Sequence, residues 1–497
     1  MYREGSGRAE MLALDLGASN GRAMLGTLDD GRLSLEETFR FPNEPLYVDG
    51  HWCWDIPRLL SNIKDSLAAG GHRVSLDSVG IDCWGVDYGL IDSGGNLVGR
   101  PRHYRDEQTS GMREVAFSRI PQEQLYRETG NAFERYNTLF QILGMIAEGS
   151  GILDRADSLL LMADLFVYLL TGAKRTEFTA ATTTQLVGAG SREWNRRVLT
   201  SMGIPDRLFS PIELPGSVRG ELRTSRETGL GSVPIIAVGH HDTASAIAGI
   251  PGLEKGHAFL SSGTWSLIGM EVSQPILDTR AMELGYTNEG CVDGGYRFLQ
   301  NIMGLWILQE CKRIWDSQGG IVSFEELSAL AETAPAFTCF IDPANEVFFA
   351  PGDMPRRVRE YCSWSGQTVP DGRAAIVRCI LESLALKYRA ALESLEEVSG
   401  QKISVLHLVG GGSRNRLLNQ FTASSIKRPL FSGPEEAAAL GNITVQAMSL
   451  GAISNLQEGR KIIGASVQRD EYVPHNSEAW DEAYQRFLRV CAYGSLA

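Results

Sequence analysis

The chain has 497 residues, of which 43% are hydrophobic and 22% charged, with a formal net charge of −13. This length predicts two large domains, because one hydrophobic core rarely serves so long a chain. The acidic balance and the absence of a long basic run argue against a partner of duplex nucleic acid. No apolar run reaches the roughly 18 residues of a membrane helix, and the N-terminus lacks the apolar core of a signal peptide, so we expect a cytoplasmic protein with no membrane partner.

The first strong pattern is a predicted hairpin formed by apolar residues 11–14 and 23–25 around a polar loop. Gly17 and Gly21 in this loop tolerate backbone angles closed to other residues, so that several N–H groups can converge on one anion. Asp15 at the strand end would repel a phosphate unless a divalent cation lay between them. The pattern predicts a phosphate and metal site, and an ordinary hairpin with a structural carboxylate is the alternative.

A similar pattern occurs once more, in residues 258–271, where a small polar turn at 261–264 separates two apolar runs. Two such loops suggest two related domains that close on one nucleotide. Pro251, Gly252 and Gly256 interrupt regular structure, which places the domain boundary near this segment. We therefore expect an N-terminal domain over residues 1–249 and a C-terminal domain over residues 250–497.

The remaining N-terminal pattern predicts a strand over 32–41 and a helix over 57–67, followed by two strands within 79–92 joined at Trp84-Gly85. Gly85 would let a ligand approach the backbone, and a buried structural turn explains it equally well. Further helices are expected over 122–129, 139–148 and 158–170, the last ending at Gly172.

A buried strand over 233–238 precedes Asp242, which therefore lies where a strand gives way to a helix. Proteins of the α/β class place reactive groups at such junctions, although an aspartate can also serve there only as a helix cap. His240 and His241 are adjacent and point in different directions, so we do not expect them to bind a metal.

In the second half, Asn301 is expected at the start of a helix that runs through Trp315, with Gln309 two turns along. Capping and solvent exposure are the alternative explanations for these two residues. A long amphipathic helix is predicted over 371–397. The strand over 405–409 runs into three glycines and then a helix, a ready site for a nucleoside or phosphate.

The eight cysteines are scattered and include no Cys-x-x-Cys pair, so the spacing predicts reduced, mostly buried thiols and no zinc or redox motif. Cys362 and Cys379 are 379 − 362 = 17 residues apart and could form a disulfide. The sequence leaves that pairing open.

Four of these stretches together resemble the FGGY family of carbohydrate kinases: DLGASNGR at 15–22, HDTASA at 241–246, SSGTWS at 261–266 and VGGGSRN at 409–415. The likeness covers roughly residues 11 to 480 and is closest to the kinases that phosphorylate L-rhamnulose. It implies two ribonuclease-H-like domains of the actin/hexokinase ATPase type with a central cleft. It also implies ATP and Mg²⁺ as cofactors and transfer of phosphate to the 1-hydroxyl of L-rhamnulose.

The resemblance also implies roles for individual residues. Asp242 resembles the general base, and its sugar-binding companions are Gly85, His241, Thr243 and Asn301. The residues similar to nucleotide contacts are Ala18, Ser19, Asn20, Gly21, Arg22, Thr264, Gln309 and Gly411. Asp15 resembles the group near magnesium. His240 stands where relatives tend to have a smaller residue, which leaves the local shape of this turn open.

Two other functions remain as alternatives. A sibling kinase would act on L-fuculose, xylulose or glycerol, and a non-catalytic actin-like sugar sensor would bind without turnover. Asp15 and Asp242 argue against the sensor, since phosphoryl transfer needs such groups. We expect a monomer or a small homo-oligomer.

Overall fold

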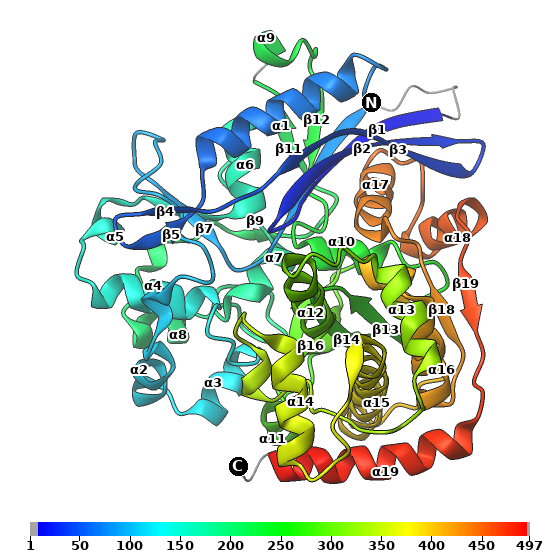
Figure 1. The fold of residues 1–497 in the computed structure, drawn as a ribbon. Helices are drawn as coiled ribbons and strands as arrows, with labels where there is room; N and C mark the ends of the chain where they lie inside the picture. The colour runs from blue at the N-terminus through cyan, green and yellow to red at the C-terminus, as the bar shows by residue number, and fades with distance from the viewer. Residues whose placement is uncertain (1–7, 224, 495–497) are drawn as a thin grey trace. The chain divides into compact units, whose positions relative to one another are not determined.

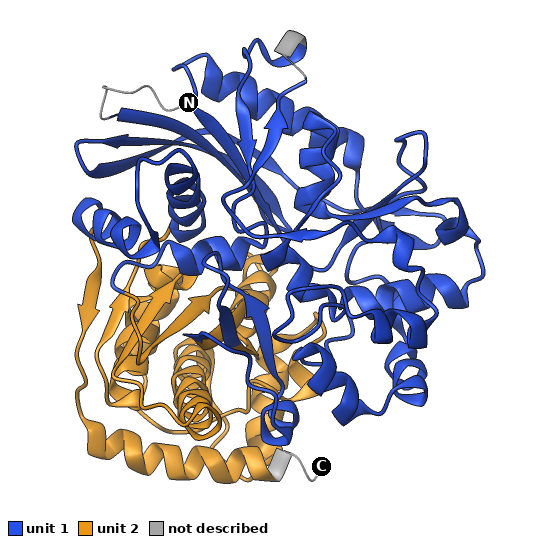
Figure 2. Ribbon diagram, turned by 180° about the vertical axis from the view of Figure 1, so that it is seen from behind, with its two compact units in different colours: residues 1–252, 271–298, 436–467 blue, residues 253–270, 299–435, 468–497 orange. Residues whose placement is uncertain are grey.

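The computed structural model describes residues 8–223 and 225–494, and its contacts divide the chain into two compact units (Figure 2). Unit 1 comprises residues 1–252, 271–298 and 436–467. Unit 2 comprises residues 253–270, 299–435 and 468–497. The chain first passes from unit 1 to unit 2 after Gly252, three residues from the expected boundary, and it later returns to unit 1 twice.

Unit 1 is organised around a six-stranded sheet (Figure 1). The strand order is β11 (Val218–Glu221), β12 (Pro234–Ile236), β6 (Ser78–Cys83), β1 (Arg8–Leu16), β2 (Asn20–Asp29) and β3 (Arg32–Pro42). β1 and β2 pair antiparallel with Leu12 opposite Leu25, which confirms the predicted hairpin. β1 and β6 are parallel, with Asp15 opposite Asp82. The ends of β1 and β6 therefore bring two carboxylates side by side.

Shorter strands and helices complete unit 1. The strands form the pairs β4 (Leu46–Val48) with β5 (His51–Cys53), β7 (Tyr88–Ile91) with β8 (Ser158–Leu161), and β9 (Thr176–Glu177) with β10 (Ile212–Glu213). The helices are α1 (Ile56–Gly71), α2 (Met112–Arg119), α3 (Gln122–Thr129), α4 (Thr138–Ala147), α5 (Ile152–Arg155), α6 (Met162–Thr171), α7 (Phe178–Ala181), α8 (Arg196–Met202), α9 (Ser225–Thr228), α10 (Asp242–Ala248), α11 (Thr279–Glu283), α17 (Ala437–Ser449) and α18 (Leu456–Ser466).

The central strand β1 is buried on both faces from Ala9 onward, and its middle residues 11–14 are all apolar. Leu12 and Leu14 pack with Ile63 of α1 in one cluster of buried side chains. Met11 and Ala13 point the other way and pack with residues of α17 and α18 in a second cluster. Burying both faces of one strand fixes the position of its polar end at Asp15, because a one-residue slip would exchange the two faces.

Unit 2 contains most of a seven-stranded sheet. The order is β15 (Tyr286–Gly290), β16 (Tyr296–Met303), β14 (Trp265–Val272), β13 (His257–Ser262), β17 (Val405–Val409), β18 (Leu430–Ser432) and β19 (Asp470–Tyr472), of which β15 belongs to unit 1. The helices of unit 2 are α12 (Trp306–Ser317), α13 (Phe324–Thr333), α14 (Met354–Trp364), α15 (Gly372–Ser399), α16 (Arg416–Ile426) and α19 (Ser477–Gly494). β13 pairs antiparallel with β14 and parallel with β17, so it repeats the roles that β1 plays in unit 1.

Two predicted elements differ from the structure. Residues 158–161 form strand β8, and helix α6 begins only at Met162. Asn301 lies on strand β16, and the helix predicted to start there begins at Trp306. In both cases the local sequence suited helix and strand, and the neighbouring strand decided between them. The two strands predicted within 79–92 are present as β6, in the main sheet, and β7, which pairs with β8.

The eight cysteines are free thiols, and seven of them are buried. Cys362 and Cys379 do not form a disulfide in this structure. None of the helices within residues 8–223 and 225–494 combines the length and the apolar character that a membrane crossing requires.

Candidate active site

Three carboxylates of unit 1 lie near one another at the ends of strands β1 and β6. Asp15 and Asp82 are partners across these strands, and the N–H of Cys83 donates to the carbonyl of His240 at 2.8 Å, which brings Asp242 to the same edge. Burial and the charge of Asp15 raise the pKa of Asp82 well above its ordinary value. Burial, together with Asp15, also raises the pKa of Asp242. Because these carboxylates repel one another, binding of a cation or a proton at this edge of the sheet is favoured.

The turn before Asp242 is held by buried polar groups. Glu177 accepts the N–H of His240 at 3.1 Å, and the hydroxyl of Thr179 accepts the N–H of His241 at 3.2 Å. The Nδ1 atom of His240 lies 3.0 Å from Asp164, and its ring is fully buried. The family resemblance implies a smaller residue at position 240. The contacts of the buried His240 ring explain the histidine, because its side chain supports the turn before Asp242.

Asp242 is the first residue of α10, and His241 occupies the N-cap position. No side-chain hydrogen bond caps this helix, so the capping explanation for Asp242 is not borne out. The Oδ1 atom of Asp242 instead accepts the hydroxyl of Thr243 at 3.0 Å and lies 3.5 Å from Nε2 of His241. The predicted trio of residues 241–243 therefore forms one polar group at a strand-to-helix junction.

Two residues that the sequence reasoning missed complete this group. Glu289 on β15 lies 3.3 Å from Nδ1 of His241, and Arg297 on β16 donates to Glu289 at 3.0 Å. Burial works to raise the pKa of Glu289, but the hydrogen bond and charge of His241 and the charge of Arg297 outweigh it and lower the pKa. Charged residues inside two otherwise buried strands were the signal that could have identified them. Glu289 and Arg297 both contact Nδ1 of His241 and together hold the imidazole beside Asp242.

The loop between β1 and β2 is a tight turn in which the N–H of Gly17 donates to the carbonyl of Asn20 at 2.9 Å. Among the described residues, none accepts a hydrogen bond from the N–H groups of Ala18 and Ser19, so both donors remain available to an anion. Neither Gly17 nor Gly21 has a positive φ, which corrects our explanation for these glycines. A Cβ on Gly21 would lie 2.2 Å from the ring of Phe41, so close packing requires this glycine.

Arg22 follows the loop on β2 and is held between two carboxylates. Its guanidinium donates to Asp15 at 2.6 Å and also to Glu436, the residue before α17. The predicted phosphate contact of Arg22 thus competes with two ion pairs, and Asp15 has one of its oxygens engaged.

The turn at Gly85 carries an unusual backbone. Val86 has a φ of 65°, which is strained for a β-branched residue, and its N–H donates to the hydroxyl of Thr183 at 3.0 Å. A Cβ on Gly85 would lie 3.1 Å from Thr183. Such strain is concentrated at ligand sites, which favours the ligand-contact interpretation of Gly85 over a plain turn.

A buried carboxylate anchors this turn. Asp87 accepts the indole N–H of Trp54 at 2.7 Å and that of Trp84 at 3.0 Å, and the two rings lie 4.2 Å apart. Burial raises the pKa of Asp87 to about 7, against the effect of its hydrogen bonds. Trp54 is only 1% exposed, so it packs in the core below the Gly85 turn.

Unit 2 carries the other predicted nucleotide residues. The hydroxyl of Thr264, at the turn between β13 and β14, donates to Gln309 on α12 at 3.0 Å. The glycines after β17 approach the same hairpin, because a Cβ on Gly412 would lie 2.1 Å from the hydroxyl of Ser262. A Cβ on Gly411 would meet nothing within 4 Å, so this residue borders open space.

The structure thus assembles the predicted residues in two sets. Within unit 1, Asp15, Ala18, Ser19, Asn20, Gly21, Arg22, Gly85, His241, Asp242 and Thr243 all lie on or next to the ends of β1 and β6 or the start of α10. Within unit 2, Thr264, Gln309 and Gly411 belong to one hairpin and its neighbours, whereas Asn301 lies within strand β16.

Two family models match this chain in order. The N-terminal domain of the FGGY family of carbohydrate kinases matches residues 10–249, and the C-terminal domain of the same family matches residues 258–450.

Relatives that align over nearly the whole chain include rhamnulokinases. A rhamnulokinase of Bacteroides thetaiotaomicron is 43% identical over 97% of this chain and 99% of its own. A rhamnulokinase of Pectobacterium carotovorum is 39% identical over 96% of this chain and 95% of its own.

Solved structures show the same fold. A gluconate kinase from Lactobacillus acidophilus has a TM-score of 0.83 at 16% identity, covering 99% of this chain and 100% of that one. A Plasmodium falciparum glycerol kinase with ADP has a TM-score of 0.78 at 17% identity, covering 97% and 98%. The likeness confirms the predicted α/β fold of the actin/hexokinase ATPase type. Because both family domains match in order and relatives align over nearly the whole chain, this chain belongs to the FGGY family of carbohydrate kinases.

Proposed function

We propose that this kinase transfers the γ-phosphate of ATP to the 1-hydroxyl of L-rhamnulose, giving L-rhamnulose 1-phosphate and ADP. The relatives named rhamnulokinase, which align with 97% and 96% of the chain, support the substrate. The observation that carries the chemistry is the half-buried Asp242 at the start of α10, with its raised pKa and its contacts to His241 and Thr243.

Asp242 is the general base of this proposal. The sugar oxygen forms a bond to the γ-phosphorus while the bond from that phosphorus to the β–γ bridging oxygen breaks. The hydroxyl proton passes to a carboxylate oxygen of Asp242. A raised pKa makes this carboxylate a better proton acceptor than an ordinary aspartate, provided that it is ionised at the working pH. Gly85, His241, Thr243 and Asn301 bind the sugar in this proposal.

The phosphate chain is assigned to both hairpin loops. The free N–H groups of Ala18 and Ser19 suit phosphate oxygens, with Asn20, Gly21 and Arg22 completing the loop. In unit 2, Thr264 and Gln309 offer a hydroxyl and an amide, and Gly411 leaves room for the nucleoside. Positioning and charge stabilisation of this kind account for most of the catalysis in phosphoryl transfer.

The residues also fit the Mg²⁺ that we assign to this site. Asp82 has a buried Oδ1 atom without a hydrogen-bond partner, and Asp15 lies opposite it on the neighbouring strand. Arg22 engages only one oxygen of Asp15, the two adjacent carboxylates still repel each other, and oxygen ligands are those that Mg²⁺ prefers. Asp15 and Asp82 would hold the ion directly or through water, and the ion would neutralise charge on the phosphates. We further propose a cytoplasmic protein that acts as a monomer or small homo-oligomer without nucleic-acid or membrane partners.

A sugar screen tests the assignment. Purified protein is assayed for ADP release with MgATP and, separately, L-rhamnulose, L-fuculose, xylulose and glycerol, with Asp242→Asn as the control for contaminating kinases. L-Rhamnulose should give the highest kcat/KM, and phosphorus–proton coupling in the NMR spectrum of the product should place the phosphate on carbon 1. A higher kcat/KM for another sugar would reassign the substrate, and ADP release without any sugar dependence would refute the kinase assignment.

A further inference from the structure

Two amide side chains of helix α17 are buried against the main sheet of unit 1 (Figure 1). Asn442 and Gln446 lie one turn apart on α17, and both are fully buried. Their neighbours Ile443 and Ala447 pack on apolar residues of β1. A buried amide costs free energy unless its hydrogen bonds are satisfied, and an apolar residue would avoid that cost. The two amides therefore need an explanation other than packing.

The amides connect Ser78 with Asp82 on β6 through a series of hydrogen bonds. The hydroxyl of Ser78 donates to Oε1 of Gln446 at 2.7 Å, and Nε2 of Gln446 donates to Oδ1 of Asn442 at 2.7 Å. Nδ2 of Asn442 then donates to Oδ2 of Asp82 at 2.5 Å. Nε2 of Gln446 also donates to the carbonyl of Leu12 on β1 at 3.1 Å. We call Gln446 and Asn442 the amide bridge.

The partners of the amide bridge fix the orientation of each amide. The carbonyl of Leu12 can only accept, so Gln446 presents its nitrogen there and its oxygen to the hydroxyl of Ser78. The same nitrogen requires the oxygen of Asn442, which leaves the nitrogen of Asn442 to face Asp82. Oδ2 of Asp82 is therefore held as a hydrogen-bond acceptor, whereas its buried Oδ1 has no hydrogen-bond partner among the described residues.

Gly80 lies between Ser78 and Asp82 on the same face of β6 and leaves room for the amide bridge. A Cβ on Gly80 would lie 2.8 Å from Nε2 of Gln446 and closer still to Oδ1 of Asn442. A larger residue at this position would displace both amides. The glycine of β6 and the amides of α17 thus depend on one another.

We propose that the amide bridge positions Asp82 for the divalent cation of the kinase reaction. By holding Oδ2, the bridge keeps Oδ1 of Asp82 available to the cation, directly or through water. The inference rests on the proposed function, which assigns a cation to Asp15 and Asp82. Losing the hydrogen-bond partner of a metal-binding carboxylate weakens metal affinity about 10- to 100-fold. Asn442 and Gln446 are therefore positioning residues that act through Asp82.

Binding of Mn²⁺, a paramagnetic substitute for Mg²⁺, tests the proposal without sugar or turnover. Full-length protein with ADP is titrated with Mn²⁺ at fixed pH, free Mn²⁺ is measured by electron paramagnetic resonance, and the Mn²⁺ bound by ADP alone is subtracted. Asn442→Leu is close in size but lacks the donor to Asp82, so the Kd of Mn²⁺ should rise about 10- to 100-fold. Gln446→Met should raise it by a smaller factor, because Asn442 keeps its donor and loses only the partner that orients it. Circular dichroism at the assay temperature establishes which variants are folded.

Two controls separate positioning from packing. Thr444 is another fully buried polar residue of α17, and its hydroxyl donates to the carbonyl of Leu440 within the same helix. Thr444→Val should therefore keep the wild-type Kd of Mn²⁺. When Asp82→Asn is already present, adding Asn442→Leu should weaken binding no further, because the bridge acts through the carboxylate.

The outcomes distinguish this inference from the kinase assignment itself. A wild-type Kd in a folded Asn442→Leu or Gln446→Met protein would overturn the inference and leave the kinase assignment in place. An undiminished effect of Asn442→Leu in the Asp82→Asn protein would do the same, as would a wild-type protein that binds no Mn²⁺ beyond that held by ADP. Failure of the kinase assignment would appear instead in the sugar screen, which uses none of these variants.

Discussion

The two sets of predicted site residues differ sharply in charge. In unit 1 the predicted Asp15, His241 and Asp242 are joined by Asp82, Glu289 and Arg297, which were not among the predicted site residues. The side chains of His241 and Asp242 are 12% and 31% exposed, and the other four residues are buried. In unit 2 the predicted nucleotide residues are uncharged: the hydroxyl of Thr264, the amide of Gln309 and Gly411. Groups that interact with developing charge change the barrier, whereas neutral contacts made equally in ground and transition states change only binding. The comparison predicts that substitutions in unit 1 lower kcat and those in unit 2 raise KM for ATP.

The largest expected effect belongs to Asp242. Asp242→Asn removes the proton acceptor but keeps the shape, so kcat should fall by about 10²- to 10⁴-fold, the range for losing a general base. Calorimetric titrations should show ATP and sugar binding nearly unchanged. Asp92→Asn, which alters a carboxylate away from this edge, is the control and should keep its kcat. A fully active Asp242→Asn enzyme would show that Asp242 is not the general base.

The pH dependence of kcat sharpens the same point. Burial and the charge of Asp15 raise the pKa of Asp242, and only its ionised form accepts a proton. As the pH falls through this raised pKa, kcat should fall tenfold per pH unit, beginning above the pH at which an ordinary aspartate with a pKa of about 3.9 would titrate. The measurement is kcat at saturating ATP and sugar across the acid range where the fold persists by circular dichroism. An acid limb at or below the ordinary value would contradict the assigned environment.

A pair of neighbouring glycines tests unit 2. A Cβ on Gly412 would lie 2.1 Å from Ser262, whereas one on Gly411 would meet nothing. Gly412→Ala should therefore lower the free energy of unfolding by about 1–3 kcal/mol, the usual cost of overpacking. Gly411→Ala should leave the thermal midpoint unchanged and raise KM for ATP, because its methyl group would enter the proposed nucleotide space. If Gly411→Ala binds ATP normally, Gly411 does not contact the nucleotide.

The smallest effect is expected at Thr264. Thr264→Val keeps the volume and removes the hydroxyl that donates to Gln309. Losing one hydrogen bond of about 0.5–1.5 kcal/mol should raise KM for ATP roughly 2- to 10-fold at nearly constant kcat. Steady-state kinetics at saturating sugar measure both parameters. A fall in kcat without a change in KM would mean that unit 2 shares in the chemistry and that the comparison is too simple.

Local patterns predicted much of the fold. Turn residues and apolar spacing correctly predicted the first hairpin, the strand over 405–409 and the helix over 122–129. Residues 158–161 and Asn301 were misassigned because strand pairing with distant segments decided their conformation. Spacing along the chain cannot reveal such partners.

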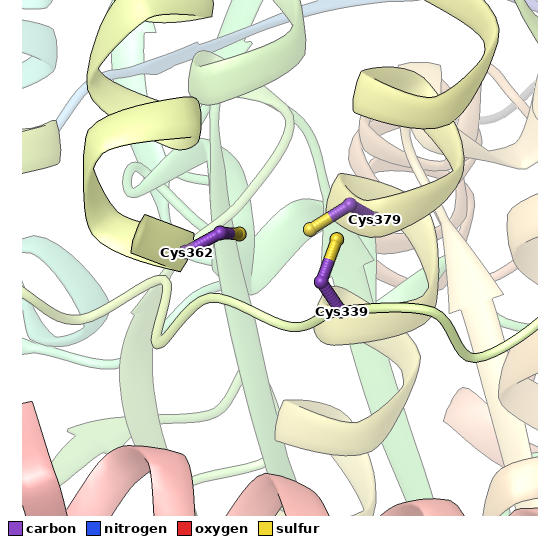
Figure 3. A group of neighbouring side chains, drawn as sticks. All are labelled: Cys339, Cys362 and Cys379. Atoms are coloured by element: carbon purple, nitrogen blue, oxygen red, sulfur yellow. The ribbon is translucent and has the colours of Figure 1, made fainter. Parts of the chain in front are cut away.

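The candidate site was also predicted only in part. Asp15 and Asp242 lie in short motifs with a chemical reason at each position, so they were identified from the sequence. Glu289 and Arg297 were missed because each is a single charged residue in a strand without a recognisable motif and acts through His241. The sequence singled out Cys362 and Cys379 as a possible pair, but their spacing could not show that Cys339 lies beside both of them (Figure 3).

The return of residues 436–467 to unit 1 has a consequence for synthesis of the chain. Asn442 on α17 donates to Asp82 at 2.5 Å, and Gln446 on the same helix donates to the carbonyl of Leu12 at 3.1 Å. During synthesis, unit 1 therefore cannot complete its fold until residues 436–467 have been made. Until then, one face of its main sheet remains uncovered. A nascent chain stalled before residue 436 should expose that apolar face to chaperones and proteases, and cutting the gene at the family boundary should not yield a folded N-terminal fragment.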